Sequence, residues 1–152
     1  MPVYEKLAAL SISLPAAVPS SAPYSPCVQT GDLCFLSGHI ARRDGKPWVG
    51  QLGVDMTTAQ AKEAARAVAI DLLATLHASA GDLDRVQRLV KLLVLVNSAP
   101  TFTEHHLVAN GASELLAEIF GSEKLPARSS FGVAQLPFGS CVEIEMVAEV
   151  RS

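Results

Sequence analysis

Two spacings of hydrophobic residues occur along the chain, one typical of helices and one typical of strands. The clearest helical pattern spans 55–82, where Thr57 and Gln60 form a capping-box signature and Gly81 provides an end. The apolar stripe of this segment consists of Ala61, Ala64, Ala65, Val68, Leu72 and Leu76. One face of the helix should therefore pack against a core.

A second helix is predicted over 101–121. The pair Asn110-Gly111 falls in its middle, and both residues are poor helix formers, so we expect a helix that is weakened at its centre. Residues 1–10 predict a short N-terminal helix. Residues 14–28 contain four prolines and predict an extended loop.

Strand-like segments occur before, between and after the two long helices. The predicted strands lie at 32–40, 49–53, 85–98, 127–135 and 141–150. The dipeptide Asp44-Gly45 is a hairpin-turn signal, which would let the second segment return beside the first.

The last strand alternates most regularly between apolar and other side chains. One face carries Val142, Ile144, Met146, Ala148 and Val150, and the other carries Cys141, Glu143, Glu145, Val147 and Glu149. The apolar face is expected to contact the helices. The carboxylate-bearing face is expected to meet water or cations.

The order of strands, helix, strand, helix and two strands predicts an α+β fold, with a single sheet and two helices packed on one face. The sequence shows no internal repeat, so we expect one domain over 1–152. The other face of the sheet mixes apolar and charged residues. Such a face is a candidate for burial against copies of the same chain.

Composition narrows the classes of function. The 152 residues are 49% hydrophobic and 18% charged, as in a globular protein, and the net charge of −3 does not favour nucleic-acid binding. Three cysteines without a C-x-x-C pair fit a reducing cytoplasm better than a disulfide framework. The first apolar run is too short for a signal peptide or a membrane span.

Patterns for metals, nucleotides and nucleophilic serines are weak or missing. The histidines show no H-x-x-x-H spacing, and no glycine-rich phosphate loop occurs, so no metal or cofactor is expected. A Ser/His/Asp triad stays open, because triads depend on spatial arrangement, but no G-x-S-x-G elbow supports one.

Arg128 is a permanent cation at the start of an apolar strand. It could grip a substrate carboxylate with two hydrogen bonds, or form an internal ion pair with Glu143 or Glu145 on a neighbouring strand. A glutamate beside an arginine stays ionised. Glu143 could therefore orient a water molecule or be half of that ion pair.

Two segments resemble the reactive-intermediate deaminases, the Rid family, also called YjgF-like or L-PSP proteins. The stretch "APYSPCVQTGDLCFLSGHI" is similar to the family's G-P-Y-S-x-A-V and S-G-Q motifs. The stretch "LPARSSFGVAQLP" followed by "VEIEMVAEV" is similar to its P-A-R-S-x-V-x-V-x-x-L-P and E-I-E signature. The resemblance runs from Ala22 to Val150 and leaves residues 1–20 as an N-terminal extension.

The resemblance implies a chorismate-mutase-like fold and a homotrimer, in which three sheets form a central barrel and clefts lie between subunits. It also implies a cytoplasmic hydrolase without metal or cofactor. The implied substrates are 2-imino acids, such as 2-iminobutanoate and 2-iminopropanoate, which become 2-oxo acids and ammonia.

The same resemblance assigns roles by position in the motifs. Arg128 would bind the substrate carboxylate, and Glu143 would orient the attacking water. Tyr24 would line the cleft from an adjacent subunit, while Ser37 and Gly38 would lie near its floor.

Three features depart from the family pattern. Ser130 stands where many members have a cysteine whose backbone contacts the ligand. His39 replaces the usual glutamine and would change the polarity of the substrate-binding cleft. The segment "HHLVANGASELLAEIFG" at 105–121 is unlike the usual second helix.

Three hypotheses follow, in order of preference. The first is an imine deaminase of the Rid type. The second is a module that binds small 2-oxo acids through Arg128 without turnover. The third is an L-PSP-type endoribonuclease, which the net charge of −3 disfavours.

Overall fold

A five-stranded sheet in the order β1-β2-β7-β5-β6 forms the centre of the protein. In this computed structural model, which describes residues 2–151, the strands are Cys27–Thr30 (β1), Leu33–Ile40 (β2), Val86–Asn97 (β5), Ala127–Val133 (β6) and Val142–Val150 (β7). Neighbouring strands are antiparallel, except that β5 and β6 are parallel. The two ends of the predicted domain, residues 1 and 152, lie outside the described residues.

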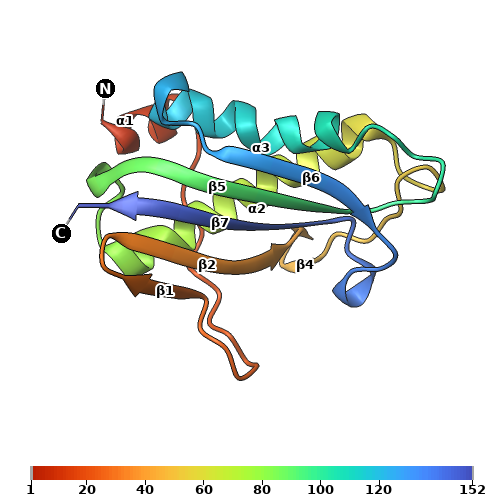
Figure 1. Cartoon of the computed structure of the whole chain (residues 1–152), viewed down its shortest axis with the longest axis horizontal. Coiled ribbons are helices and arrows are strands. Elements are labelled where there is room, and N and C mark those ends of the chain that lie inside the picture. Colours follow the sequence, from red (N-terminus) through yellow and green to blue (C-terminus); the bar gives the residue numbers. More distant parts are fainter. Residues whose placement is uncertain (1, 152) are drawn as a thin grey trace.

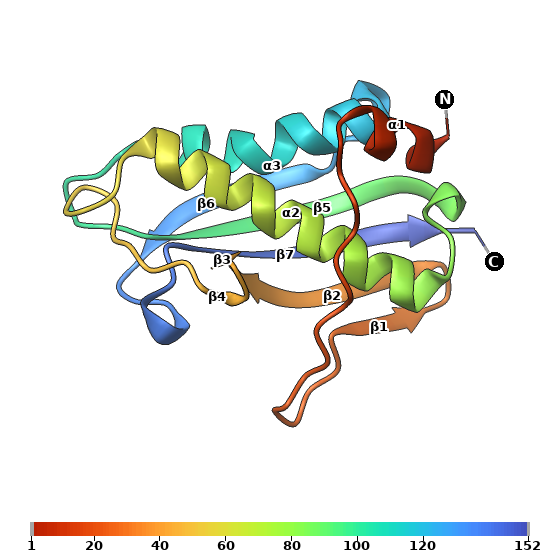
Figure 2. The same ribbon diagram turned by 180° about the vertical axis from the view of Figure 1, so that it is seen from behind.

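The helices cover one face of this sheet, which confirms the predicted α+β arrangement. They span Val3–Ala9 (α1), Thr58–Ala80 (α2) and His105–Phe120 (α3). Figure 1 shows the uncovered face of the sheet, and Figure 2 shows α2 and α3 lying across the other face. Within residues 2–151, none of the helices combines the length and the hydropathy needed to cross a bilayer.

Helix α2 forms as its sequence predicts. The Thr57 side chain accepts a hydrogen bond from the backbone of Gln60, whose side chain accepts one from the backbone of Thr57, and Gly81 ends the helix in the left-handed region at φ 82°. All six residues of the predicted apolar stripe are buried. The apolar face of β7 is buried too, so the alternation read from its sequence is confirmed.

The N-terminal residues join the same core. Val3 and Leu7 of α1 are buried, and the Tyr4 hydroxyl lies 2.8 Å from Nδ1 of His77 on α2. In Figure 2 the chain leaves α1, crosses the outer side of α2 and projects as a loop before β1. The extension therefore brings this proline-rich loop to the β1 edge of the sheet.

Three predicted details of the sheet are wrong. The hairpin at Asp44-Gly45 closes between Arg42–Arg43 (β3) and Lys46–Pro47 (β4), and 49–53 contains only isolated bridges. The end of the proline-rich segment contributes strand β1. The last two strands are not neighbours, because β5 lies between them.

Helix α3 is uninterrupted, although a weak centre was expected at Asn110-Gly111. The reason is the close approach of α3 to α2. A Cβ atom placed on Gly111 would lie 1.9 Å from the carbonyl oxygen of Lys62, a distance at which one helix must move. Glycine at this position lets the two helices pack, which outweighs its low helix propensity.

We predict that Gly111→Ala destabilises the protein by about 1–3 kcal/mol, because the added methyl group overpacks the contact between α2 and α3. At an open helix position the same change would stabilise by roughly 0.5–1 kcal/mol, so the sign is diagnostic. Urea unfolding followed by circular dichroism measures the difference. Glu118→Ala, at an exposed position of the same helix, should change stability by less than about 0.5 kcal/mol. Stabilisation by Gly111→Ala would contradict the packing argument.

Candidate functional site

A cavity of about 550 Å³ opens where the outer edge of β2 loses its strand partner. Strand β1 pairs with β2 only as far as Leu36, so the outer edge of the following residues of β2 is not paired with another strand. The walls come from the proline-rich loop, α2, β7 and the turn Pro137–Gly139. Five of the predicted site residues line this cavity: Tyr24, Ser37, Gly38, His39 and Glu143.

A β-bulge shapes the floor of the cavity. Leu36 pairs with Met146 and His39 pairs with Ile144, so Ser37 and Gly38 together oppose one residue of β7. The bulge turns His39 toward the helix face, where its partner Ile144 also lies. Ser37 is fixed by the proline-rich loop, because its hydroxyl donates to the carbonyl of Ser25 at 2.6 Å.

Gly38 lies directly against the carboxylate of Glu143. A Cβ atom on Gly38 would be 2.3 Å from Oε2 of Glu143, too close for any side chain. A side chain at position 38 would therefore force the Glu143 carboxylate to move, so the glycine allows the carboxylate its present position. Gly38 and the Glu143 side chain thus lie in contact on the cavity floor, and a change at one is expected to move the other.

The lining of the cavity is acidic. Glu143, Glu145 and Asp71 contribute carboxyl groups, against one arginine, Arg42. Burial, with a smaller contribution from the negative charge of Glu145, raises the pKa of Glu143 above its ordinary value. A carboxyl group with a raised pKa is better suited to accept a proton near neutral pH than an ordinary surface glutamate.

His39 is held on both sides of its ring. Nδ1 lies 2.6 Å from the carbonyl oxygen of Ser37, so it carries the proton, and Nε2 lies 2.8 Å from the hydroxyl of Thr75 on α2. Burial lowers the pKa of His39, which favours the neutral ring, so Nε2 accepts a hydrogen bond from Thr75. His39 thus lines the cavity with both nitrogens already bonded.

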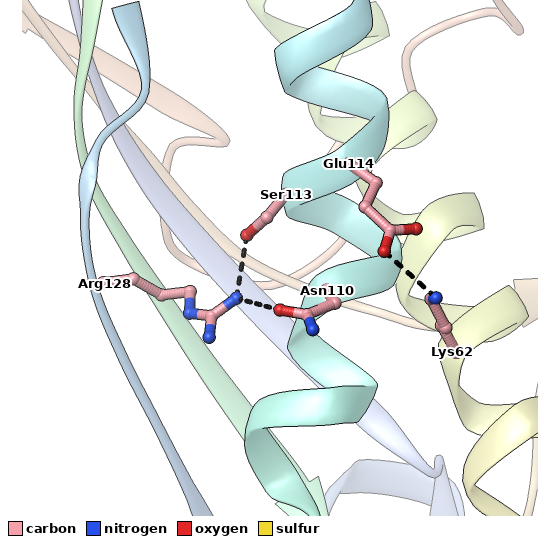
Figure 3. Close-up of polar contacts among 5 residues, drawn as sticks. All are labelled: Lys62, Asn110, Ser113, Glu114 and Arg128. Atoms are coloured by element: carbon pink, nitrogen blue, oxygen red, sulfur yellow. Dashed lines mark hydrogen bonds and ion pairs between the residues drawn. The ribbon is translucent and has the colours of Figure 1, made fainter. Parts of the chain in front are cut away.

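Arg128 lies outside this cavity. It is on β6, the opposite edge of the sheet, and its side chain lies on the helix face, where Nη1 donates to Asn110 Oδ1 at 2.8 Å and to Ser113 Oγ at 3.0 Å (Figure 3). Ser130 lies two residues further along the same strand, on the same face. Three strand spacings, about 14 Å, separate β6 from β2.

The internal ion pair considered for Arg128 does not form. Strand β5 lies between β6 and β7, and Glu143 and Glu145 are on the face of β7 opposite to the helices. Within residues 2–151 the ion pair present joins Lys62 to Glu114. Within residues 2–151, Arg128 therefore does not lower the pKa of Glu143, which burial and the charge of Glu145 raise.

Several lining residues were not predicted. Asp71 and Thr75 are four residues apart on α2, so they share one side of that helix and face the end of β2. The sequence feature that could have revealed Asp71 and Thr75 is that both are polar residues within an otherwise apolar part of the helix. Phe138, in the turn before β7, adopts φ 60° and is 77% exposed at the cavity rim.

Comparisons with known proteins decide the family. The model of the family described as Endoribonuclease L-PSP matches residues 15–150. The chain belongs to this family. The match to the L-PSP family model confirms the resemblance found in the sequence. The similarity of the structure to solved structures of this family confirms the chorismate-mutase-like fold.

Three similar proteins illustrate the range of this L-PSP family. Protein TCP17 of Trypanosoma cruzi is 44% identical over 152 residues, covering 99% of this chain and 95% of that protein. A 2-iminobutanoate/2-iminopropanoate deaminase of Mus musculus is 31% identical, covering 88% of this chain and 84% of that protein. A protein of unknown function from Agrobacterium tumefaciens has a solved structure with a TM-score of 0.90 at 38% identity, covering 98% of this chain and 92% of that chain.

We predict that Gly38→Ala displaces the Glu143 carboxylate toward solvent and costs less than about 1 kcal/mol of stability, because the atoms that must move belong to a flexible side chain. The raised pKa of Glu143 should fall toward its ordinary value, because the group becomes better hydrated. Carbon-13 NMR titration of the glutamate carboxyl groups measures this shift, with Glu143→Gln identifying the signal. An unchanged titration in the alanine variant would show that the contact does not position Glu143.

We predict that the protein loses stability as the pH falls below about 6.5, the ordinary histidine pKa, partly through His39. Burial lowers the pKa of His39 in the folded state, so the unfolded chain takes up the proton first and is favoured on acidification. Asp71, whose pKa burial raises, acts in the opposite direction.

Denaturant unfolding at pH 7.5 and pH 5.5 tests this dependence. His39→Gln should lose less stability between these two values than the wild type, since glutamine does not titrate. His105, whose pKa is also lowered by burial, is present in both proteins and cancels from the comparison. An equal loss in both proteins would rule out a contribution from His39.

Proposed function

We propose that the chain hydrolyses 2-imino acids to 2-oxo acids and ammonia in a homotrimer, with each site shared between two copies. One observation carries the proposal. A half-buried carboxylate, Glu143, lines an acidic cavity at one edge of the sheet, and Arg128, a guanidinium without an acidic partner among residues 2–151, lies at the other edge. In the proposed reaction the arginine would bind the substrate carboxylate and the glutamate would act on water, so a second copy would supply the arginine.

The surface of the sheet supports such an assembly. Phe35, Val28 and Phe131 are 44%, 53% and 47% exposed, and they lie on strands of the sheet that the helices leave open on one face. Three copies in a closed ring would bury these side chains, with β6 of each copy beside the free part of β2 in the next. Arg128 and Ser130 of one copy would then adjoin the cavity of its neighbour.

The chemistry fits these residue types. The guanidinium of Arg128 would hold the substrate carboxylate and present the C=N carbon to water, with Tyr24 and Ser37 beside it. The acidic cavity would suit the other end of the substrate, since a protonated imine carries a positive charge. Names of relatives, such as the deaminase of Mus musculus, support this substrate class.

Glu143 would act as the base for the attacking water. Water loses a proton to Glu143 as its oxygen bonds to C2, and the C=N electron pair moves to nitrogen. Starting from the protonated imine, this proton passes from Glu143 to the nitrogen, which becomes an ammonium group. Glu143 then takes the remaining proton of the new hydroxyl as the C–N bond breaks and the carbonyl of the 2-oxo acid forms, and it passes that proton to the departing ammonia, which leaves as ammonium. Glu143 returns to its starting state, so no other reactant is required.

Cleavage of RNA, which the description of the family model suggests, has less support. The cavity carries three carboxyl groups against Arg42, and such a field repels a phosphate backbone. A small imino acid has one negative charge, which a single arginine can balance.

The test uses two variants that remove different halves of the site. Threonine dehydratase with L-threonine supplies 2-iminobutanoate, and the early rate of 2-oxobutanoate formation is followed. Wild type should exceed buffer, whereas Arg128→Ala and Glu143→Gln should each fall by about a hundredfold or to the buffer rate. Wild type that binds 2-oxobutanoate without accelerating hydrolysis would indicate the non-catalytic binding module instead.

Mixing the two variants tests whether the site is shared. When Arg128→Ala and Glu143→Gln chains are refolded together, roughly a quarter of the interfaces receive an intact arginine from one copy and an intact glutamate from the next. Activity should therefore reappear at roughly a quarter of the wild-type rate. Sedimentation should show a trimer. A mixture as inactive as its components would place both groups in one chain's site and overturn the shared arrangement.

A further inference from the structure

We propose that Asn110 and Ser113 of α3 are positioning residues that aim Arg128 at the substrate carboxylate. This inference rests on the proposed function, since it assigns the grip on the carboxylate to one particular side of the guanidinium. It gives a role to a segment, 105–121, that departs from the family pattern.

The hydrogen-bond pattern of Arg128 defines the available side of the group. A guanidinium has five N–H groups, two of them on Nη1. Both hydrogens of Nη1 have partners, Asn110 Oδ1 at 2.8 Å and Ser113 Oγ at 3.0 Å. Among residues 2–151, Nε and Nη2 have no partner, and together they form the side-on pair of donors that matches a carboxylate. The carboxylate should therefore bind to the Nε–Nη2 side (Figure 3).

Both partners of Arg128 are neutral. An amide oxygen and a hydroxyl can orient the guanidinium without cancelling its charge, whereas a glutamate or aspartate in either place would form an internal ion pair. Arg128 is exposed and keeps its full positive charge for an external anion. An orienting contact to neutral groups is the arrangement expected of an arginine that must bind and release a substrate.

The two partners are held firmly by the helix that carries them. Asn110 and Ser113 are three residues apart on α3 and so face the same way, toward β6. The other side of this turn packs on α2 through Gly111, and Glu114 is paired with Lys62 at 3.1 Å (Figure 3). The packing of the two helices thus sets the direction in which Arg128 points.

Replacing the amide by a carboxylate gives the sharpest test. Asn110→Asp keeps the size of the side chain and puts a negative charge in hydrogen-bond range of Nη1. We expect the dissociation constant for 2-oxobutanoate, measured by calorimetry, to rise roughly tenfold, since an internal anion competes with the ligand for the guanidinium. The melting temperature should stay unchanged or rise. Loss of affinity without loss of stability is a result that a merely structural role would not give.

Removing and restoring one neutral partner gives a second test. Ser113→Ala should weaken 2-oxobutanoate binding about threefold, and Ser113→Thr, which keeps the hydroxyl, should restore it. In turnover, the loss should appear in KM, with kcat within about twofold of wild type, because the carboxylate is held equally before and during reaction. Glu114→Gln, which removes the ion pair on the other side of α3, is the matched control and should change neither constant.

The outcomes separate this inference from the proposed function. Wild type that binds 2-oxobutanoate but does not hydrolyse the imine overturns the proposed function alone. Wild-type affinity in Asn110→Asp, or equal losses in Ser113→Ala and Glu114→Gln, overturns the positioning role alone. A wild-type protein that neither binds 2-oxobutanoate nor accelerates hydrolysis of the imine overturns both.

Discussion

The separation of Glu143 from Arg128 by the sheet itself is the constraint on which the rest of the site depends. Strand β5 lies between their two strands, and the side chains lie on opposite faces. Neither charge can neutralise the other within one chain, so the pKa of Glu143 stays raised and Arg128 stays available to an anion. A neighbouring arginine would lower that pKa again. In the proposed trimer, the strength of the base would therefore depend on how far the bound substrate carboxylate offsets the arginine.

The parts of the fold that could be predicted from sequence are those set by local pattern. The stripe of α2 and the alternation of β7 each follow from one periodicity, and five site residues gather because their motifs lie on the adjacent strands β2 and β7 or in the loop before β1. The place of Arg128 could not be predicted this way. A short turn between 127–135 and 141–150 favours a hairpin, but β6 instead pairs in parallel with β5 after the crossover through α3.

The pair Asn110-Gly111 shows how a propensity argument fails for a physical reason. Each residue disfavours a helix when its neighbours are ignored, by up to about 1 kcal/mol for glycine. In the fold, the glycine allows α3 to approach Lys62, and the asparagine contacts Arg128 on the adjacent side of the helix. Both contacts join residues that are distant in sequence, so no local pattern could reveal them.

The neutral partners of Arg128 also determine at which stage, folding or ligand binding, the side chain loses its conformational freedom. An arginine side chain carries about 2 kcal/mol of rotamer entropy, which a freely moving side chain would give up on binding its ligand. A carboxylate partner would order the side chain but would have to be displaced by the substrate. Two neutral acceptors order it during folding and leave the Nε–Nη2 side open. The loss of Arg128 rotamer entropy then occurs during folding, where the packing of α2 and α3 can offset it. A small substrate, which makes few contacts of its own, can therefore still bind.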